Sequence, residues 1–63
     1  MTSRIETNSE ILGGKPVIKG TRISVEFVLH LLAQGWSEEE ILHNYPQLQK
    51  EDLQAIYEYE TGY

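Results

Sequence analysis

Residues 24–35 read SVEFVLHLLAQG, and this run predicts the central helix of a small helical domain. Ser24 is a favourable N-cap, because its hydroxyl can accept from a backbone N–H of the first turn. Apolar residues then recur at helical spacing, at Val25, Val28, Leu29 and Leu32, until Gly35 ends the pattern. Phe27 and Leu31 add a second apolar flank, so the helix is apolar around most of its circumference. We therefore expect a core helix that also contacts a second copy of the chain through Phe27 and Leu31.

The residues that follow predict a second, shorter helix. Ser37 and Glu40 form a capping-box pattern, in which each side chain accepts from the backbone N–H of the other residue. Trp36 and Ile41 stand at the two positions of a hydrophobic staple, which fixes the angle at which the chain enters the helix. Pro46 stops this helix after about two turns.

A third helix is expected to begin near Gln49, although glutamine is a weak cap, and to continue to Gly62. Its inner stripe is apolar and consists of Leu53, Ile56 and Tyr57. Three short helices predict a mostly α protein with a trihelical helix-turn-helix unit over residues 24–62. Because the third helix is largely acidic, we do not expect it to enter a DNA groove.

Residues 1–23, which we call the N-terminal ribbon, contain many turn formers. Residues 13–23 read GGKPVIKGTRI, in which glycines and a proline separate two short apolar pairs. This pattern predicts short strands at residues 16–18 and 22–24, and the alternation at residues 4–7 predicts an edge strand. We therefore expect a short N-terminal β-hairpin in front of the helices.

Three cations, Lys15, Lys19 and Arg22, project from the ribbon. One interpretation is a binding element, and the other is a basic surface hairpin that merely caps the fold, since glycine and proline mark turns more often than sites. Under the first interpretation these three residues are the candidate DNA-binding residues.

Charge is divided unevenly along the chain. The net charge of −5 comprises +2 in residues 1–22 and −7 in residues 23–63. Phosphate contacts must therefore concentrate in the basic third, whereas the acidic remainder suits a basic protein partner. The candidate partner-binding residues lie near the C-terminus, where carboxylates and aromatic rings mix, and are Glu58, Tyr59, Glu60 and Tyr63.

Length and composition limit the possible architectures. A chain of 63 residues forms a single domain, residues 1–63, and a domain of this size buries only about 60% of its unfolded surface. The absence of cysteine excludes disulfides, so we expect a homodimer to supply further burial. No apolar run approaches the ~20 residues of a membrane span, and no signal peptide is evident, which predicts a soluble cytoplasmic protein.

Catalysis, metal binding and nucleotide binding have little support in the sequence. The only two histidines, His30 and His43, lie on different predicted helices without ligand-like spacing. The sequence at residues 13–15, Gly-Gly-Lys, lacks the spacing and the hydroxyl residue of a phosphate loop. We therefore expect a protein that is not an enzyme and that uses no metal or cofactor.

Three blocks of the chain resemble, in order, the domain-of-unknown-function family 433. They are GKPVIKGTRI at residues 14–23, GWSEEEIL at 35–42 and YPQL at 45–48, and the resemblance covers almost all of residues 4–60. It implies a homeodomain-like or winged-helix-like trihelical fold. For some members it also implies a VapB-type antitoxin, whose toxin partner is a PIN-like ribonuclease.

The leading functional hypothesis is therefore an antitoxin that binds a PIN-like ribonuclease and also its own operator DNA. An acidic surface would neutralise a basic RNA-binding groove, while a ribbon repeated across a two-fold axis would hold DNA. The alternatives are a DNA-binding regulator without a toxin and a structural or scaffold subunit. Genomic adjacency to a gene for a small PIN-like protein would separate the first hypothesis from the others.

Overall fold

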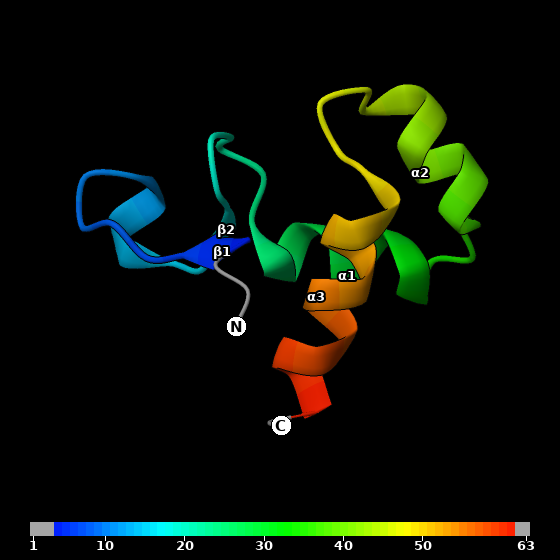
Figure 1. The fold of residues 1–63 in the computed structure, drawn as a ribbon. Coiled ribbons are helices and arrows are strands. Elements are labelled where there is room, and N and C mark those ends of the chain that lie inside the picture. The colour runs from blue at the N-terminus through cyan, green and yellow to red at the C-terminus, as the bar shows by residue number, and fades with distance from the viewer. Residues whose placement is uncertain (1–3, 62–63) are drawn as a thin grey trace.

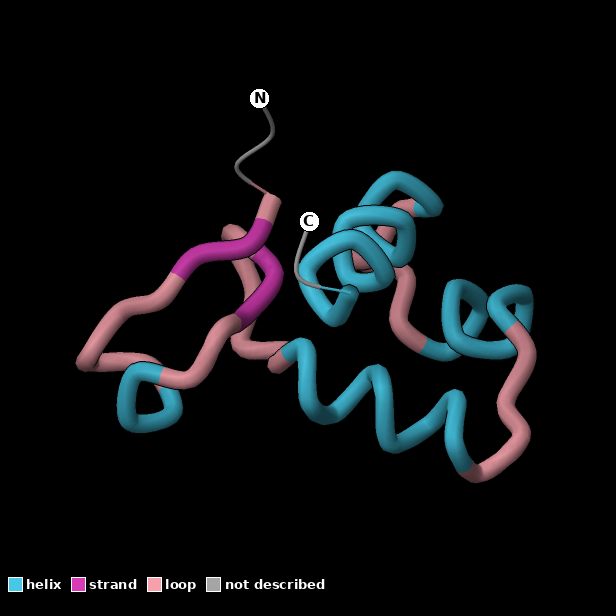
Figure 2. Tube along the Cα trace, turned by 90° about the horizontal axis from the view of Figure 1, so that it is seen from below, coloured by secondary structure: helices cyan, strands magenta, loops and turns pink. Residues whose placement is uncertain are grey.

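In the computed structural model, three α-helices and a two-stranded antiparallel sheet make up the part of the chain that is described, residues 4–61 (Figure 1). The bounds are β1 Ile5–Glu6, the 3-10 turn η1 Leu12–Gly14, β2 Val17–Ile18, α1 Val25–Ala33, α2 Glu38–Asn44 and α3 Lys50–Thr61. This arrangement confirms the mostly α, trihelical class with an N-terminal hairpin. Figure 2 shows the hairpin on one side of α3 and α2 on the other, with α1 running from the hairpin toward α2.

Helix α1 begins and ends as its sequence predicts. The Ser24 Oγ accepts from the backbone N–H of Phe27 at 2.9 Å, which satisfies one of the free donors of the first turn. At the other end Gly35 adopts a φ of 98°, which a residue with a Cβ rarely adopts. The N–H groups of Gly35 and Trp36 then donate to the carbonyls of Leu32 and Leu31, a pairing that closes the helix.

Helix α2 forms the predicted capping box. The backbone N–H of Ser37 donates to Glu40 Oε1 at 2.8 Å, and the N–H of Glu40 donates to Ser37 Oγ at 3.1 Å. Ile41 is fully buried, Trp36 packs against the core, and the helix ends two residues before Pro46. Both the start and the short length of α2 are therefore confirmed.

Helix α3 is capped from inside its own first turn. The backbone N–H of Gln49 donates to Asp52 Oδ2 at 2.8 Å, so the carboxylate three residues later supplies the bond that a glutamine cap does not. Asp52 is only 4% exposed, an unusual environment for a carboxylate. The start near Gln49 is confirmed, and the buried Asp52 carboxylate supplies its cap.

The core combines all three helices with the second strand. Its members include Ile18 of β2, Val28 of α1, Ile41 of α2 and Ile56 of α3, each at most 2% exposed. Leu31 belongs to the same cluster at 6% exposed. Leu31 was expected to contact a second copy of the chain together with Phe27, but its burial in the core of the single chain leaves only Phe27 accessible for that contact.

The hairpin pairs the two ends of the N-terminal ribbon. Ile5 lies opposite Ile18 and Glu6 opposite Val17, so the predicted edge strand is confirmed. The strand expected at residues 22–24 is reduced to a single bridge with Val17 and one backbone bond, from the Ile18 N–H to the Ile23 carbonyl at 2.9 Å. A tight turn follows β2, in which the Thr21 N–H donates to the Ile18 carbonyl. The chain then enters α1 a few residues later.

Between the two strands, residues 7–16 form a loop that projects from the helices on the side away from α2 (Figures 1 and 2). Three successive residues with positive φ, namely Leu12, Gly13 and Gly14, turn the chain back toward β2. Two of the three are glycines, which adopt this conformation without steric cost. The loop therefore returns the chain to Lys15 beside α1. None of the helices within residues 4–61 is long and apolar enough to cross a membrane.

Candidate functional site

A groove of about 450 Å³ lies where the end of the ribbon, the start of α1 and the end of α3 meet. We call it the α1–α3 groove. Its apolar lining comes from Pro16, Val25, Leu29 and the ring of Tyr59, and its charged lining from Lys15, Glu26 and Glu60. The groove thus brings together a residue predicted for DNA binding and two residues predicted for partner binding, which the sequence had assigned to separate surfaces.

The ribbon side of the groove carries an exposed ion pair. Lys15 Nζ lies 3.1 Å from Glu26 Oε1, and the two side chains are 61% and 74% exposed. Pairs exposed to this degree contribute about 0–1 kcal/mol, because water and salt screen them. Either side chain can therefore leave this ion pair and bind a charged group of a partner at little cost in free energy.

The α3 side of the groove carries the most exposed of the large hydrophobic side chains among residues 4–61. Tyr59 is 51% exposed, and Glu60 beside it is exposed too. Tyrosines with one face open to water often anchor protein interfaces, because they bury much area for little loss of side-chain entropy. This end of α3 extends beyond the rest of the helical body in Figure 1, which leaves it accessible.

The predicted acidic partner surface is divided by the geometry of the helix. Glu58 lies on a different side of α3, beside Arg4, Glu51 and Gln54, where a smaller hollow of about 220 Å³ opens. The structure therefore places Tyr59 and Glu60 together in one groove and Glu58 outside it. The fourth candidate, Tyr63, lies outside the described residues.

The remaining ribbon cations lie apart from the groove. Lys19 and Arg22 are both exposed, and neither side chain forms an ion pair with any residue of the described range 4–61. They flank the turn that follows β2, while Lys15 lies at the start of α1. The three candidate DNA-binding residues are therefore exposed, but only Lys15 lines the groove.

A partly buried ion pair joins the ribbon to α3. Arg4 Nη1 donates to Asp52 Oδ1 at 2.8 Å, and the Asp52 side chain is only 5% exposed. The same carboxylate accepts from the Gln49 N–H, so one side chain fixes both the start of α3 and the position of β1. Sequence reasoning missed this contact, because 48 residues separate its partners and neither position carries a distinctive local pattern.

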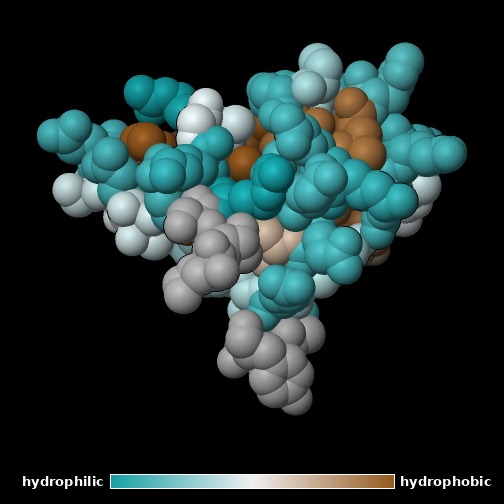
Figure 3. Space-filling model, viewed as in Figure 1, coloured by the Kyte–Doolittle hydropathy of each residue, from teal (hydrophilic) through white to brown (hydrophobic). Residues whose placement is uncertain are grey.

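Aromatic side chains line the junction of α1 and α2. The Phe27 and Tyr45 rings meet edge to face, with centroids 5.6 Å apart, and Trp36 lies 6.4 Å from Tyr45. Phe27 remains 37% exposed, so this predicted dimer contact is accessible. The face of the molecule seen in Figure 3 is mostly hydrophilic, and hydrophobic residues appear on it only as small, separate areas.

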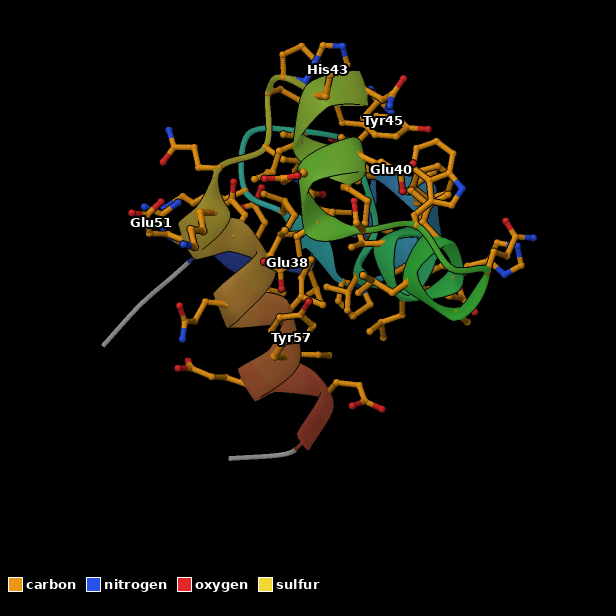
Figure 4. All side chains as sticks on the ribbon, turned by 90° about the vertical axis from the view of Figure 1, so that its right-hand side faces the viewer. Glu38, Glu40, His43, Tyr45, Glu51 and Tyr57 are labelled. Carbon is orange, nitrogen blue, oxygen red and sulfur yellow. The ribbon has the colours of Figure 1, made fainter. Side chains whose placement is uncertain are left out.

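A polar contact joins the start of α2 to α3, as Figure 4 shows for Glu38 and Tyr57. The Tyr57 hydroxyl donates to Glu38 Oε2 at 2.6 Å. This hydrogen bond to the carboxylate, together with partial burial, raises the pKa of Tyr57 to about 12. The contact is structural, since a tyrosine with a raised pKa is a poor proton donor or nucleophile near neutral pH.

The histidines do not form a site with the carboxylates. His30 and His43 are exposed and lie on different helices. Within residues 4–61, no three His, Asp or Glu side chains converge in a way that could hold a metal ion. Among residues 4–61, the α1–α3 groove and the exposed cations are the features that we consider for binding.

These features define a small trihelical domain with an N-terminal hairpin and a mixed apolar and charged groove. Residues 5–59 match the family described as "Protein of unknown function (DUF433)", and the chain belongs to this family. The match extends from β1 to Tyr59, so it includes nearly the whole groove.

Two relatives agree with this assignment. The uncharacterized protein y4eO of Sinorhizobium fredii is 39% identical over 49 residues, which are 78% of this chain. The chain spans only 22% of that protein's length. The crystal structure of a DUF433 member from Anabaena variabilis, at 2.00 Å resolution, is 37% identical and superposes with a TM-score of 0.88. That comparison covers 94% of this chain and 59% of the other. Neither description refers to an enzymatic activity.

Proposed function

We propose that this protein is the antitoxin of a toxin–antitoxin pair and that it binds and neutralises a PIN-like ribonuclease. The observation that carries the proposal is the α1–α3 groove, in which the exposed Tyr59 lies beside Glu60 on the accessible end of α3. An aromatic side chain next to a carboxylate suits a protein partner, since the ring buries area while the charge orients the partner.

Charge gives the second argument for this partner. The chain carries a net charge of −5, and residues 23–63 alone carry −7. A ribonuclease that binds RNA presents a basic surface to the phosphates, so an acidic domain is attracted to it over several ångströms before contact. The same charge disfavours a role in which α3 enters a DNA groove.

Operator DNA is the second proposed partner, and the exposed ribbon cations support it. Lys19 and Arg22 have no ion-pair partner within the described residues 4–61, so they remain available to phosphates. A regulator without a toxin would use this same surface, so DNA binding alone does not separate that alternative from the antitoxin. The two hypotheses differ in whether a neighbouring ribonuclease binds.

Co-expression with the product of a neighbouring PIN-like gene tests the antitoxin proposal. The wild-type chain should co-purify with the ribonuclease and restore growth. Glu58→Lys combined with Glu60→Lys should slow association by about tenfold and release toxicity, because it reverses one charge in the groove and one on another side of α3. A matched control, Glu10→Lys with Glu39→Lys, changes the net charge equally at exposed positions elsewhere. Full neutralisation by the first variant, at equal expression, would place the contact on another surface.

We further propose that two copies associate through the side of α1 that carries Phe27. This ring is 37% exposed, and a small domain without disulfides gains stability from further burial. Light scattering should give the mass of a dimer, and Phe27→Asp should give that of a monomer with its helical spectrum retained. A monomeric wild type at high micromolar concentration would contradict the proposal.

A further inference from the structure

We infer that the α1–α3 groove binds a partner segment in which an apolar side chain lies next to a lysine or arginine. The inference rests on the proposed function for the identity of the partner, but it specifies the chemistry that the partner must present. The geometry points to this chemistry because an apolar floor lies beside a carboxylate that has no charged partner among residues 4–61.

The apolar part of the occupant follows from the floor of the groove. Val25 and Leu29 are one helical turn apart on α1, so they lie on the same side of that helix. Pro16 closes the floor from the ribbon and has no N–H to offer a ligand. Tyr59 lines the groove from α3. A groove of about 450 Å³ with this lining accommodates one or two aliphatic or aromatic side chains. Moving each of these side chains out of water stabilises the complex.

The basic part of the occupant follows from the charges at the rim. Lys15 and Glu26 compensate each other at 3.1 Å on the ribbon side. Glu60, on the α3 side, forms no ion pair or side-chain hydrogen bond with any residue that the structure describes. The rim therefore keeps one negative charge, and an occupant with a cation next to its apolar side chain complements it.

Other occupants fit these charges less well. Nucleic acid would bring phosphates against Glu26 and Glu60, which repel them. A second copy related by a two-fold axis would place the same net negative rim against itself, on a chain that already carries −5. A basic and apolar protein segment is the occupant that both the floor and the rim favour.

Selection from random peptides displayed on phage tests the inference without the ribonuclease. Peptides enriched on the wild-type chain should combine an aliphatic or aromatic residue with a neighbouring lysine or arginine. A synthetic copy of an enriched peptide should shift the amide resonances of Val25, Leu29 and Tyr59. Glu60→Lys should weaken its binding by about tenfold, whereas the control Glu10→Lys should leave the affinity unchanged.

Leu29→Glu should abolish binding of the peptide, and the melting temperature of this variant shows whether it still folds. If Leu29→Glu does not fold, Glu60→Lys still tests the inference, because Glu60 is exposed and its substitution should not disturb the fold. Enriched peptides without cations, unchanged binding by Glu60→Lys, or a dimer that dissociates in Glu60→Lys would each overturn the inference. If peptides bind as expected but no ribonuclease complex forms, the antitoxin proposal fails while the inference stands. If the ribonuclease binds with the same affinity to Glu60→Lys, the inference fails while the antitoxin proposal stands.

Discussion

The helical body, residues 24–61, and the described part of the ribbon, residues 4–23, are held in place by different kinds of contact. In the body, the bonds that begin α1 and α2 join residues three positions apart, and a continuous core then packs the helices together. The ribbon has two strands of two residues each, which are too short to be stable alone. Its position depends on contacts with distant residues, namely the packing of Ile18 in the core and the ion pair between Arg4 and Asp52.

This difference matters for function because the α1–α3 groove lies on the boundary between the two regions. Lys15 and Pro16 come from the ribbon, whereas Leu29 and Tyr59 come from the body. The Val25 N–H donates to the Pro16 carbonyl at 3.0 Å and ties the two regions together at the groove. A change that loosens the ribbon should therefore impair the groove even where the helices stay folded. Four changes, ordered by their expected effect on the free energy of unfolding, test this comparison.

The largest effect is expected inside the body, for Ile56→Ala. Ile56 is fully buried between the helices, and removing it leaves a cavity that the neighbours fill only in part. Substitutions of this kind cost about 2–5 kcal/mol, which is most of the stability of a small domain. Urea denaturation followed by circular dichroism measures this loss. A cost below about 1 kcal/mol would mean that the core packs loosely at this position.

A smaller effect is expected at the link between the regions, for Asp52→Ala. The substitution removes the carboxylate that accepts from the Arg4 guanidinium and from the Gln49 N–H, and we expect a loss of about 2–3 kcal/mol. The estimate is below that for a fully buried pair because the Arg4 side chain is 38% exposed.

Arg4→Met is the comparison variant for this link, because it removes the long-range bond to Asp52 and keeps the cap of α3. We expect it to cost about 1 kcal/mol and to increase amide exchange in β1 and β2 before α3 is affected. If the two variants lose the same stability, the Gln49 bond contributes nothing. In that case Asp52 serves the ribbon alone.

The helices were predictable from sequence because their signals are local. Ser24 and Gly35 mark the ends of α1, and the Ser37 and Glu40 pair marks the start of α2, each within a few residues of the backbone groups that it satisfies. These predictions needed no knowledge of the tertiary structure. Leu31 was assigned wrongly because helical spacing identifies an apolar side without telling what covers it.

The groove was only partly predictable, because it joins residues that are distant in sequence. Lys15, Tyr59 and Glu60 stood out by residue type, but the pattern could not place them together. Leu29 was assigned only to the apolar side of its helix, and the place of Glu26 and Leu29 in the groove follows only from the meeting of α1 and α3 in the fold. The contact of Arg4 with Asp52 carried no signal in a single sequence, since both are ordinary surface residues until the fold brings them together.

A still smaller effect is expected for Tyr57→Phe, which removes the bond from α3 to Glu38. Because the Tyr57 side chain is 38% exposed, water competes for the bond, and we expect a loss of only about 0.5 kcal/mol. The pH dependence is more diagnostic. The bond to Glu38 raises the pKa of Tyr57 from 10.0 to about 12, so the unfolded chain releases this proton first.

The stabilisation from Tyr57 should thus be fully present below about pH 10 and should be lost as the pH rises to about 12. Thermal unfolding of the wild type and of Tyr57→Phe across this range gives the difference directly. Tyr59→Phe is a matched control on the same helix, since the Tyr59 hydroxyl donates to no residue within the described range 4–61. A constant difference between wild type and Tyr57→Phe from neutral pH to pH 12 would mean that the bond does not form in solution.

The smallest effect on stability is expected for the triple variant Lys15→Ala, Lys19→Ala and Arg22→Ala. All three side chains are exposed, and only Lys15 has an ion-pair partner within residues 4–61, so stability should change by less than about 0.5 kcal/mol. The effect on DNA should be large by contrast. A dimer that neutralises three phosphates per subunit loses affinity with salt at a log–log slope of roughly −5, and the triple variant should abolish that slope.

Binding to the chain's own promoter fragment over a salt series measures this slope, and the melting temperature confirms the fold. The double variant Lys19→Ala with Arg22→Ala divides the ribbon further, because it leaves the Lys15 contact with Glu26 intact. If Lys15 contributes to DNA binding, the slope of the double variant falls to about one third of the parent value rather than to zero, in proportion to the phosphates still neutralised. A triple variant that binds DNA as tightly as the parent would show that these three cations do not contribute to DNA binding.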